Sequence, residues 1–135
     1  MEKNMKRTDG IDRLNHISLE PQKNVCKEFG IELTNLGFRL SETFDVVEIV
    51  GTLTRKRKIK GKEVRTLRMM ADCYSKDAKL IDVLHSLWVY SIRYNPHLSF
   101  KISTLYSTTP YQEVERIVVY PMYYETAEEF EEDLE

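Results

Sequence analysis

Histidine and cysteine side chains are the first places to look for chemistry in this 135-residue chain, because they act as bases, nucleophiles and metal ligands near neutral pH. The chain has three histidines and two cysteines: His16, His85, His97, Cys26 and Cys73. The cysteines form no Cys-x-x-Cys pair, so two reduced, partly buried thiols are expected rather than a zinc site. His85 is expected in the core or at its boundary, and no known motif supplies His97 with a nucleophile.

Motifs of the common enzyme classes do not occur in the sequence. The five glycines are scattered and form no phosphate-binding loop, and neither Gly-x-Ser-x-Gly nor His-Glu-x-x-His is present. The carboxylates near the C-terminus belong to a segment expected to be too mobile to hold two groups at a catalytic separation. We therefore expect a protein that is not an enzyme, with no catalytic residue, no cofactor and no bound metal.

The strongest local signal is the basic segment 55–62, which reads Arg-Lys-Arg-Lys-Ile-Lys-Gly-Lys. In a strand, alternate side chains project to opposite sides, so an exposed tip would be positive on both faces. Such a tip could lie along phosphates, dock on another protein, or keep a hairpin end soluble. It has no aromatic residue on which bases could stack, which favours protein over nucleic acid as the partner. The expected contact residues are Arg55, Lys56, Arg57, Lys58, Ile59, Lys60, Lys62 and Arg65.

Charge is balanced over the whole chain but divided within it. The sequence has 20 lysines and arginines against 22 aspartates and glutamates, a net of -2, which argues against a generally polyanion-binding protein. Residues 55–79 carry a net charge of +7, whereas residues 113–135 carry -8. Such a subunit could place its acidic tail against a neighbour's basic hairpin, with pairing inside one chain as the alternative. The expected acidic contact residues are Glu128, Glu129, Glu131, Glu132, Asp133 and Glu135.

Length and composition predict one domain with two appendages. A hydrophobic content of 41% is enough for one core. Residues 1–24 are expected to be a mobile N-terminal arm, residues 25–126 a single α+β domain, and residues 127–135 an acidic tail. No apolar run approaches the ~18 residues of a membrane span, and residues 1–22 lack a signal-peptide core. Neither membrane contact nor secretion by a signal peptide is therefore expected.

Alternating apolar residues predict the first strands. Residues 30–33 and 36–40 look like two short extended pieces around a turn at Asn35. Residues 45–74 are expected to form one long hairpin, with a loop at residues 59–61 and a charged tip. Its predicted inward residues are Val47, Ile49, Gly51 and Leu53 on the first strand and Leu67, Met69, Ala71 and Cys73 on the second.

The apolar period changes over residues 76–94. Spacings of three and four there predict a helix, with Ser75 as its N-cap. The apolar residues of this face are Leu80, Ile81, Leu84, Leu87, Trp88 and Ile92. Two strands are expected to follow, one from Leu98 and one over residues 114–124, where Pro121 requires a bulge or an edge. The predicted fold is α+β: an antiparallel sheet, or a small β-sandwich or barrel, with a long protruding hairpin and one packed helix.

The order of these elements resembles that of the tail tube proteins of phages and related contractile particles. The similarity covers residues 30–125. Its parts are the opening residues 30–36, the strand 47–51 with the basic run 54–58, the strand returning to residues 74–75, the helix 80–94, the strand start 95–100 and the strand 114–120. It is a similarity of pattern, and tail terminator proteins of related fold share much of it.

The resemblance implies a structural protein of the virion tail, made in the host cytoplasm. Its subunits would close into hexameric rings that stack, with residues 55–62 as an assembly arm. Its partners would be copies of itself and other tail proteins. Two alternatives stay open from the residues alone: a small nucleic-acid-binding module that uses the basic hairpin, and a regulatory protein that binds a basic partner through residues 128–135.

Overall fold

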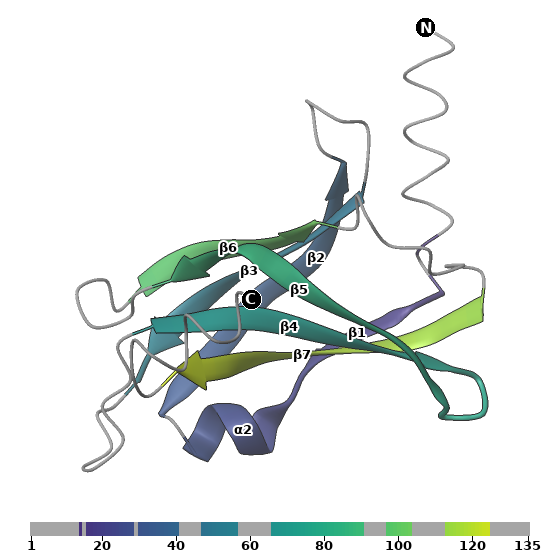
Figure 1. The fold of residues 1–135 in the computed structure, drawn as a ribbon, viewed down its shortest axis with the longest axis horizontal. Helices are drawn as coiled ribbons and strands as arrows, with labels where there is room; N and C mark the ends of the chain where they lie inside the picture. The colour runs from purple at the N-terminus through teal and green to yellow at the C-terminus, as the bar shows by residue number, and fades with distance from the viewer. Residues whose placement is uncertain are drawn as a thin grey trace, which may run out of the picture.

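The structure is a computed structural model that describes residues 14, 16–28, 30–40, 47–56, 66–90, 97–103 and 113–124. Within these residues the chain forms seven strands and one short helix, arranged as two sheets (Figure 1). In chain order the elements are β1 (Ser18–Pro21), α2 (Lys23–Glu28), β2 (Ile31–Leu40), β3 (Val47–Arg55), β4 (Thr66–Ser75), β5 (Leu80–Tyr90), β6 (His97–Ser103) and β7 (Val114–Tyr124).

The two sheets face each other as a sandwich. One sheet has the strand order β1-β7-β4-β5 and the other the order β2-β3-β6. β1 runs parallel to β7, and all other paired strands are antiparallel. The sheets also meet along their edges, since β5 lies beside β6 and β1 beside β2. The sandwich therefore approaches a flattened barrel, with α2 packed against β2 and β7 (Figure 1).

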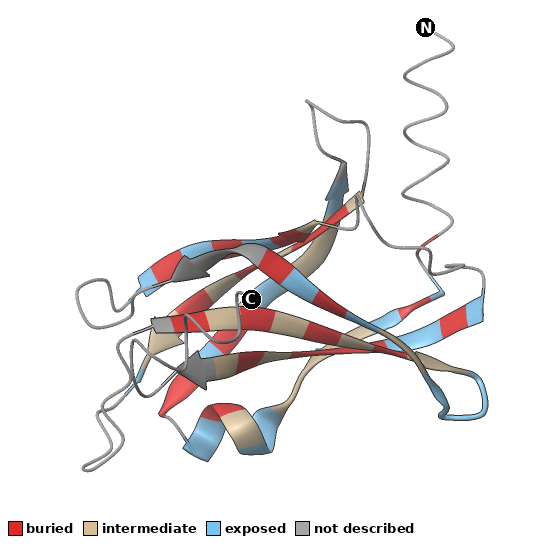
Figure 2. Ribbon diagram, viewed as in Figure 1, coloured by how far each residue is buried: buried red, intermediate tan, exposed pale blue. Residues whose placement is uncertain are grey.

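The core lies between the sheets and is built from alternate residues of each strand. Figure 2 shows buried residues separated by half-buried or exposed ones along these strands. The largest fully buried side chains include Ile49, Leu53, Leu67, Met69, Ile102 and Ile117. Each sheet thus places one face on the core and turns the other face outward.

The inward residues predicted for β3 and β4 are confirmed, but the predicted pairing of these two strands is wrong. Apart from the half-buried Val47, the residues predicted to face inward are buried: Ile49, Gly51, Leu53, Leu67, Met69, Ala71 and Cys73. β3 pairs with β2 and β6, whereas β4 pairs with β5 and β7. The two strands therefore lie in different sheets, because alternation tells which side chains point inward and not which strand is the neighbour.

The helix predicted over residues 76–94 is also wrong, because residues 80–90 form β5, antiparallel to β4. A tight turn joins the two strands. The Ser75 N–H donates to the Lys79 carbonyl at 2.9 Å, and the Ser75 Oγ accepts from the Lys79 N–H at 3.3 Å. Ala78 adopts a left-handed conformation in this turn, with a φ of 60°. The serine expected as a helix cap thus closes a turn.

Two features of β5 hide its strand pattern in the sequence. Ser86 is fully buried at an inward position, while Leu80 and Val83 are exposed, so polarity does not alternate with orientation. In addition, the β4–β5 register shifts at Met69, whose N–H donates to Ser86 Oγ at 3.1 Å. Ser86 accepts this backbone hydrogen bond and interrupts the apolar alternation of β5. The spacing of the remaining apolar residues then resembles that of a helical face.

The prediction of a mobile arm over residues 1–24 does not hold for the second half of that segment. Leu14 and Ile17 are buried in the core, and β1 pairs with β7. The Gln22 N–H extends this contact by donating to the Val119 carbonyl at 2.8 Å. Because β1 has only four residues, no long alternation marks it in the sequence. The domain therefore includes Leu14 and residues 16–24, while residues 1–13 lie outside the described residues.

β2 is one continuous strand rather than two pieces around a turn. Asn35 has a φ of 56°, and the pairing with β3 skips from Thr34 to Gly37, which marks a β-bulge. The bulge brings Leu36 over Gly51, where an added Cβ would stand 2.7 Å from Leu36 Cδ2. The turn predicted at Asn35 is therefore a β-bulge within one strand.

The strands predicted from Leu98 and over residues 114–124 are confirmed as β6 and β7. β1 pairs with β7 only as far as Val119, so Pro121 lies at the predicted local edge, with β4 as its paired strand. The fold is mostly β, and α2 is the one helix among the described residues. That helix does not have the length and apolar character needed to cross a membrane. Of the hairpin tip predicted over residues 55–62, all but the first two residues lie outside the described residues, as does the acidic tail.

Candidate binding site

The structure describes the first two residues of the predicted basic contact set. Arg55 is the half-buried last residue of β3, and Lys56 follows it as an exposed residue. The remaining members of that set, Arg57, Lys58, Ile59, Lys60, Lys62 and Arg65, lie outside the described residues, as do all six acidic tail residues. Arg55 and Lys56 are therefore the members of this set whose surroundings the structure shows.

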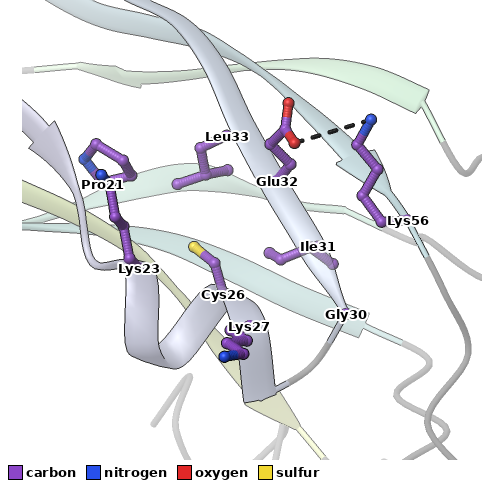
Figure 3. A pocket seen from close by; sticks show the side chains of 9 residues that line it. All are labelled: Pro21, Lys23, Cys26, Lys27, Gly30, Ile31, Glu32, Leu33 and Lys56. Atoms are coloured by element: carbon purple, nitrogen blue, oxygen red, sulfur yellow. Dashed lines mark ion pairs between the residues drawn. The ribbon is translucent and has the colours of Figure 1, made fainter.

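A pocket of about 560 Å³ opens beside Lys56, between α2, the start of β2 and the end of β3 (Figure 3). Its lining residues are Pro21, Lys23, Cys26, Lys27, Gly30, Ile31, Glu32, Leu33 and Lys56. The volume lies within the range of about 300 to 1,000 Å³ that is typical of ligand pockets. The end of β3 thus adjoins a hollow that is large enough to receive a side chain of a partner.

The local sequence of α2 explains how the pocket is formed. Cys26 is buried against the core, whereas Lys23 and Lys27 are exposed on the same short helix. Gly30 then adopts a φ of 69°, which turns the chain from the helix into β2. The Gly30 carbonyl accepts a hydrogen bond from the Lys56 N–H at 2.7 Å. This bond holds the end of β3 against the helix–strand turn.

The pocket combines an apolar floor with a basic rim. Ile31 and Leu33 are buried side chains of β2, and burial raises the pKa of the Cys26 thiol to about 11, so that thiol is neutral at pH 7. On the rim, Lys56 Nζ lies 3.8 Å from Glu32 Oε2, with both side chains more than half exposed. An exposed pair of this kind is weak. With Lys23 and Lys27, the lining carries a net positive charge.

A second hollow, of about 410 Å³, lies on the outward face of the β2-β3-β6 sheet. Beside it, the buried carboxylate of Glu48 is held 3.2 Å from Arg39 Nη2 and 3.5 Å from Lys101 Nζ. Asn35 Nδ2 donates to Thr52 Oγ1 in the same region at 3.4 Å. These polar groups satisfy one another, so the arrangement stabilises the sheet rather than presenting a reactive group.

The outward face of the β1-β7-β4-β5 sheet carries aromatic side chains with their own partners. Arg116 lies 4.8 Å from the Tyr74 ring centroid and 3.7 Å from a carboxylate oxygen of Glu20. The Tyr120 hydroxyl donates to Asp72 Oδ1 at 2.9 Å. Burial, followed by this hydrogen bond, raises the pKa of Tyr120 to about 12. This face is therefore an ordered polar and aromatic network.

The histidines and cysteines in the described part of the chain differ in exposure. His85 is exposed, rather than in the core or at its boundary as predicted, and His97 Nδ1 lies 2.9 Å from Thr54 Oγ1. Cys26 and Cys73 are both free and buried, which confirms the predicted buried thiols. No cluster of three metal-ligating side chains is found in the described part of the chain.

The sequence reasoning missed Lys23 and Lys27 as site residues. Both belong to the segment around the expected boundary between the arm and the domain, so neither was connected with the basic segment that starts at Arg55. The one available signal is the spacing of four between the two lysines, with Cys26 between them, which fits a short amphipathic helix. Their position around the same pocket as Lys56 depends on the fold.

Comparison with protein-family models, with curated proteins and with solved structures found no match for this chain.

Proposed function

We propose that this protein is a non-enzymatic structural subunit that self-assembles through a basic site. The basic site consists of Lys23, Lys27 and Lys56 around the pocket, together with the basic segment 55–62 that continues from it. Its proposed partner is the acidic part of another copy of the same chain. The expected contact is electrostatic at long range and partly apolar at short range.

One observation carries the proposal: lysines from α2 lie around the same pocket as Lys56, the second residue of the basic segment. A run of lysines beside the end of a strand can serve solubility alone. Two further lysines on a separate element, beside an apolar floor, add positive charge at one pocket, and such charge can steer an acidic partner to it. The pocket's lining contains no aromatic side chain, which again favours a protein partner over single-stranded nucleic acid.

The more specific form of the proposal is a ring-forming or tube-forming subunit of a phage tail, assembled in the virion after synthesis in the host cytoplasm. It is supported by the sequence resemblance alone, and chiefly by the strands at residues 47–51 and 114–120. The helix at residues 80–94 no longer counts toward that resemblance, because residues 80–90 form β5. Other tail proteins are the further partners in this form of the proposal.

Sedimentation velocity over a range of protein concentrations tests self-assembly. We expect the sedimentation coefficient to rise with concentration at low salt and to rise much less at high salt, because salt screens the contact. Replacement of Arg55, Arg57 and Lys58 with glutamate should abolish most of this rise. The matched control is Lys76→Glu with Lys79→Glu, in the β4–β5 turn, where both side chains are exposed. A wild-type chain that stays monomeric at every concentration contradicts the proposal.

A titration with duplex DNA and with RNA separates the proposal from the nucleic-acid alternative. Binding to phosphates through several lysines would weaken steeply as salt is added. We expect no salt-sensitive binding in the concentration range in which the protein self-associates. Tight binding to either polymer by a monomeric protein would favour the alternative function.

A further inference from the structure

We infer that the pocket between α2 and β2 binds the acidic C-terminal segment 127–135 of a second copy, with the Phe130 side chain inserted in the pocket. This inference rests on the proposed function, since it names the partner of the basic site. The segment reads Ala-Glu-Glu-Phe-Glu-Glu-Asp-Leu-Glu and has six acidic residues among nine.

The two surfaces match in charge. The pocket's rim carries Lys23, Lys27 and Lys56 against one carboxylate, Glu32. Because the Lys56–Glu32 pair is exposed and 3.8 Å long, a partner carboxylate can replace Glu32 as the neighbour of Lys56 at little cost. Lys23 and Lys27 are likewise exposed, so their ammonium groups can meet carboxylates without a large loss of hydration.

The two surfaces also match in their apolar parts. Phe130 stands between two pairs of glutamates, so an extended segment offers one aromatic ring flanked by carboxylates. The pocket has the complementary arrangement. Cys26, Ile31 and Leu33 line the hollow (Figure 3), and lysines lie around it. Burial of a phenyl ring supplies the short-range attraction that a purely ionic contact lacks.

Mixing two full-length variants tests this pairing. The pocket variant carries Lys23→Glu and Lys27→Glu, and the tail variant carries Glu128→Gln, Glu129→Gln, Glu131→Gln and Glu132→Gln. Each variant alone should sediment as a monomer, because one lacks the pocket charges and the other lacks the tail charges. Their mixture should form a one-to-one complex that does not grow further, since one functional pocket and one functional tail remain. Circular dichroism and urea unfolding should show that both variants remain folded.

A labelled peptide of residues 125–135 gives an independent measurement. It should bind the tail variant with a salt-dependent affinity, and Phe130→Ser in the peptide should weaken binding by about tenfold or more, as expected for loss of a buried aromatic ring. The Lys76→Glu, Lys79→Glu chain, combined with the tail substitutions, should bind the peptide as tightly as the tail variant does. Equal binding of the Phe130→Ser peptide overturns the role of the ring.

The outcomes separate this inference from the proposed function. If the wild-type chain assembles and both variants assemble equally well, the pocket–tail pairing is wrong while self-assembly stands. If the wild-type chain is monomeric but the tail variant binds the peptide, the tail occupies the pocket of its own chain, and the second copy is excluded as its source. If the mixed variants stay monomeric, the pairing between copies is overturned.

Discussion

At the scale of single residues, Glu48 shows how an acidic side chain is accommodated on the outward face of a sheet. It is 5% exposed, while its two cationic partners, Arg39 and Lys101, have side chains that are 58% and 46% exposed. The cations therefore remain hydrated while the carboxylate between them is enclosed. Removal of one member of such a buried group costs more than removal of one member of an exposed ion pair.

The first prediction concerns this carboxylate. Glu48→Gln should lower the free energy of unfolding by about 1 to 2 kcal/mol, because two charge-assisted contacts become weaker. The matched control is Glu32→Gln, which alters an exposed pair and should cost no more than about 0.5 kcal/mol. Urea unfolding followed by tryptophan fluorescence measures both values. Equal costs for the two substitutions would show that burial of Glu48 adds nothing.

The second prediction concerns the thiols. Burial raises the pKa of Cys26 to about 11 and, together with Asp82 and Asp72, that of Cys73 to about 12. At pH 8 both are therefore thiols in the folded chain, and iodoacetamide should alkylate them at least about tenfold more slowly than in the unfolded chain, where the pKa is about 8.5. Mass spectrometry over time measures both rates, and Cys26→Ala identifies the signal of Cys73.

The same raised pKa values determine how stability varies with pH. The unfolded chain releases these protons first, near pH 8.5, whereas the folded chain keeps them until about pH 11 to 12. The stabilisation that these two thiols contribute is thus fully present below about pH 8.5. It is lost as the pH rises through the thiol pKa values of the folded chain. Urea midpoints should accordingly fall above about pH 9, and fast alkylation of folded protein at pH 8 would contradict both expectations.

At the scale of elements, the bulge in β2 and the glycine in β3 act together. Asn35 turns the strand at the bulge, Leu36 then lies over Gly51, and Phe100 of the neighbouring β6 lies on the same glycine. A Cβ at Gly51 would stand 2.7 Å from Leu36 and 2.8 Å from the Phe100 ring. The missing side chain therefore allows β2 and β6 to share one apolar contact across β3.

The third prediction tests this contact. Gly51→Ala should lower the free energy of unfolding by about 1 to 3 kcal/mol, because the ring of the buried Phe100 must move to admit the methyl group. Gly37→Ala is the matched control in the adjacent strand, since nothing lies within 4 Å of a Cβ there. Thermal unfolding by circular dichroism gives the comparison. A Gly51→Ala chain as stable as Gly37→Ala would mean that the core has room to relax.

At the scale of the whole molecule, the N-terminal segment decides where the domain begins. Ile17 is 7% exposed in the core, although sequence reasoning placed it in a mobile arm. β1 then adds a parallel strand to β7 and leads directly into α2, which forms one wall of the pocket. The basic site thus depends on a segment that lies far from residue 55 in the sequence.

The fourth prediction follows from that placement. Ile17→Ala should lower the free energy of unfolding by about 2 kcal/mol or more, as for other buried isoleucines, whereas His16→Ala at the exposed neighbouring position should change it little. Urea unfolding of both variants measures the difference. If Ile17→Ala lowers the free energy of unfolding by less than about 0.5 kcal/mol, the segment around Ile17 does not belong to the core.

The sequence by itself determined which residues of β3 and β4 point into the core, because alternation along a strand depends only on local geometry. It also determined that the thiols are buried and that charge is divided between residues 55–79 and the C-terminal end. Tertiary structure alone decided that β3 and β4 lie in different sheets, that β5 is a strand despite its inward Ser86, and that Lys23 and Lys27 join Lys56 around one pocket. These are properties of partners distant in the chain, and no local period encodes which strand or helix a residue will meet.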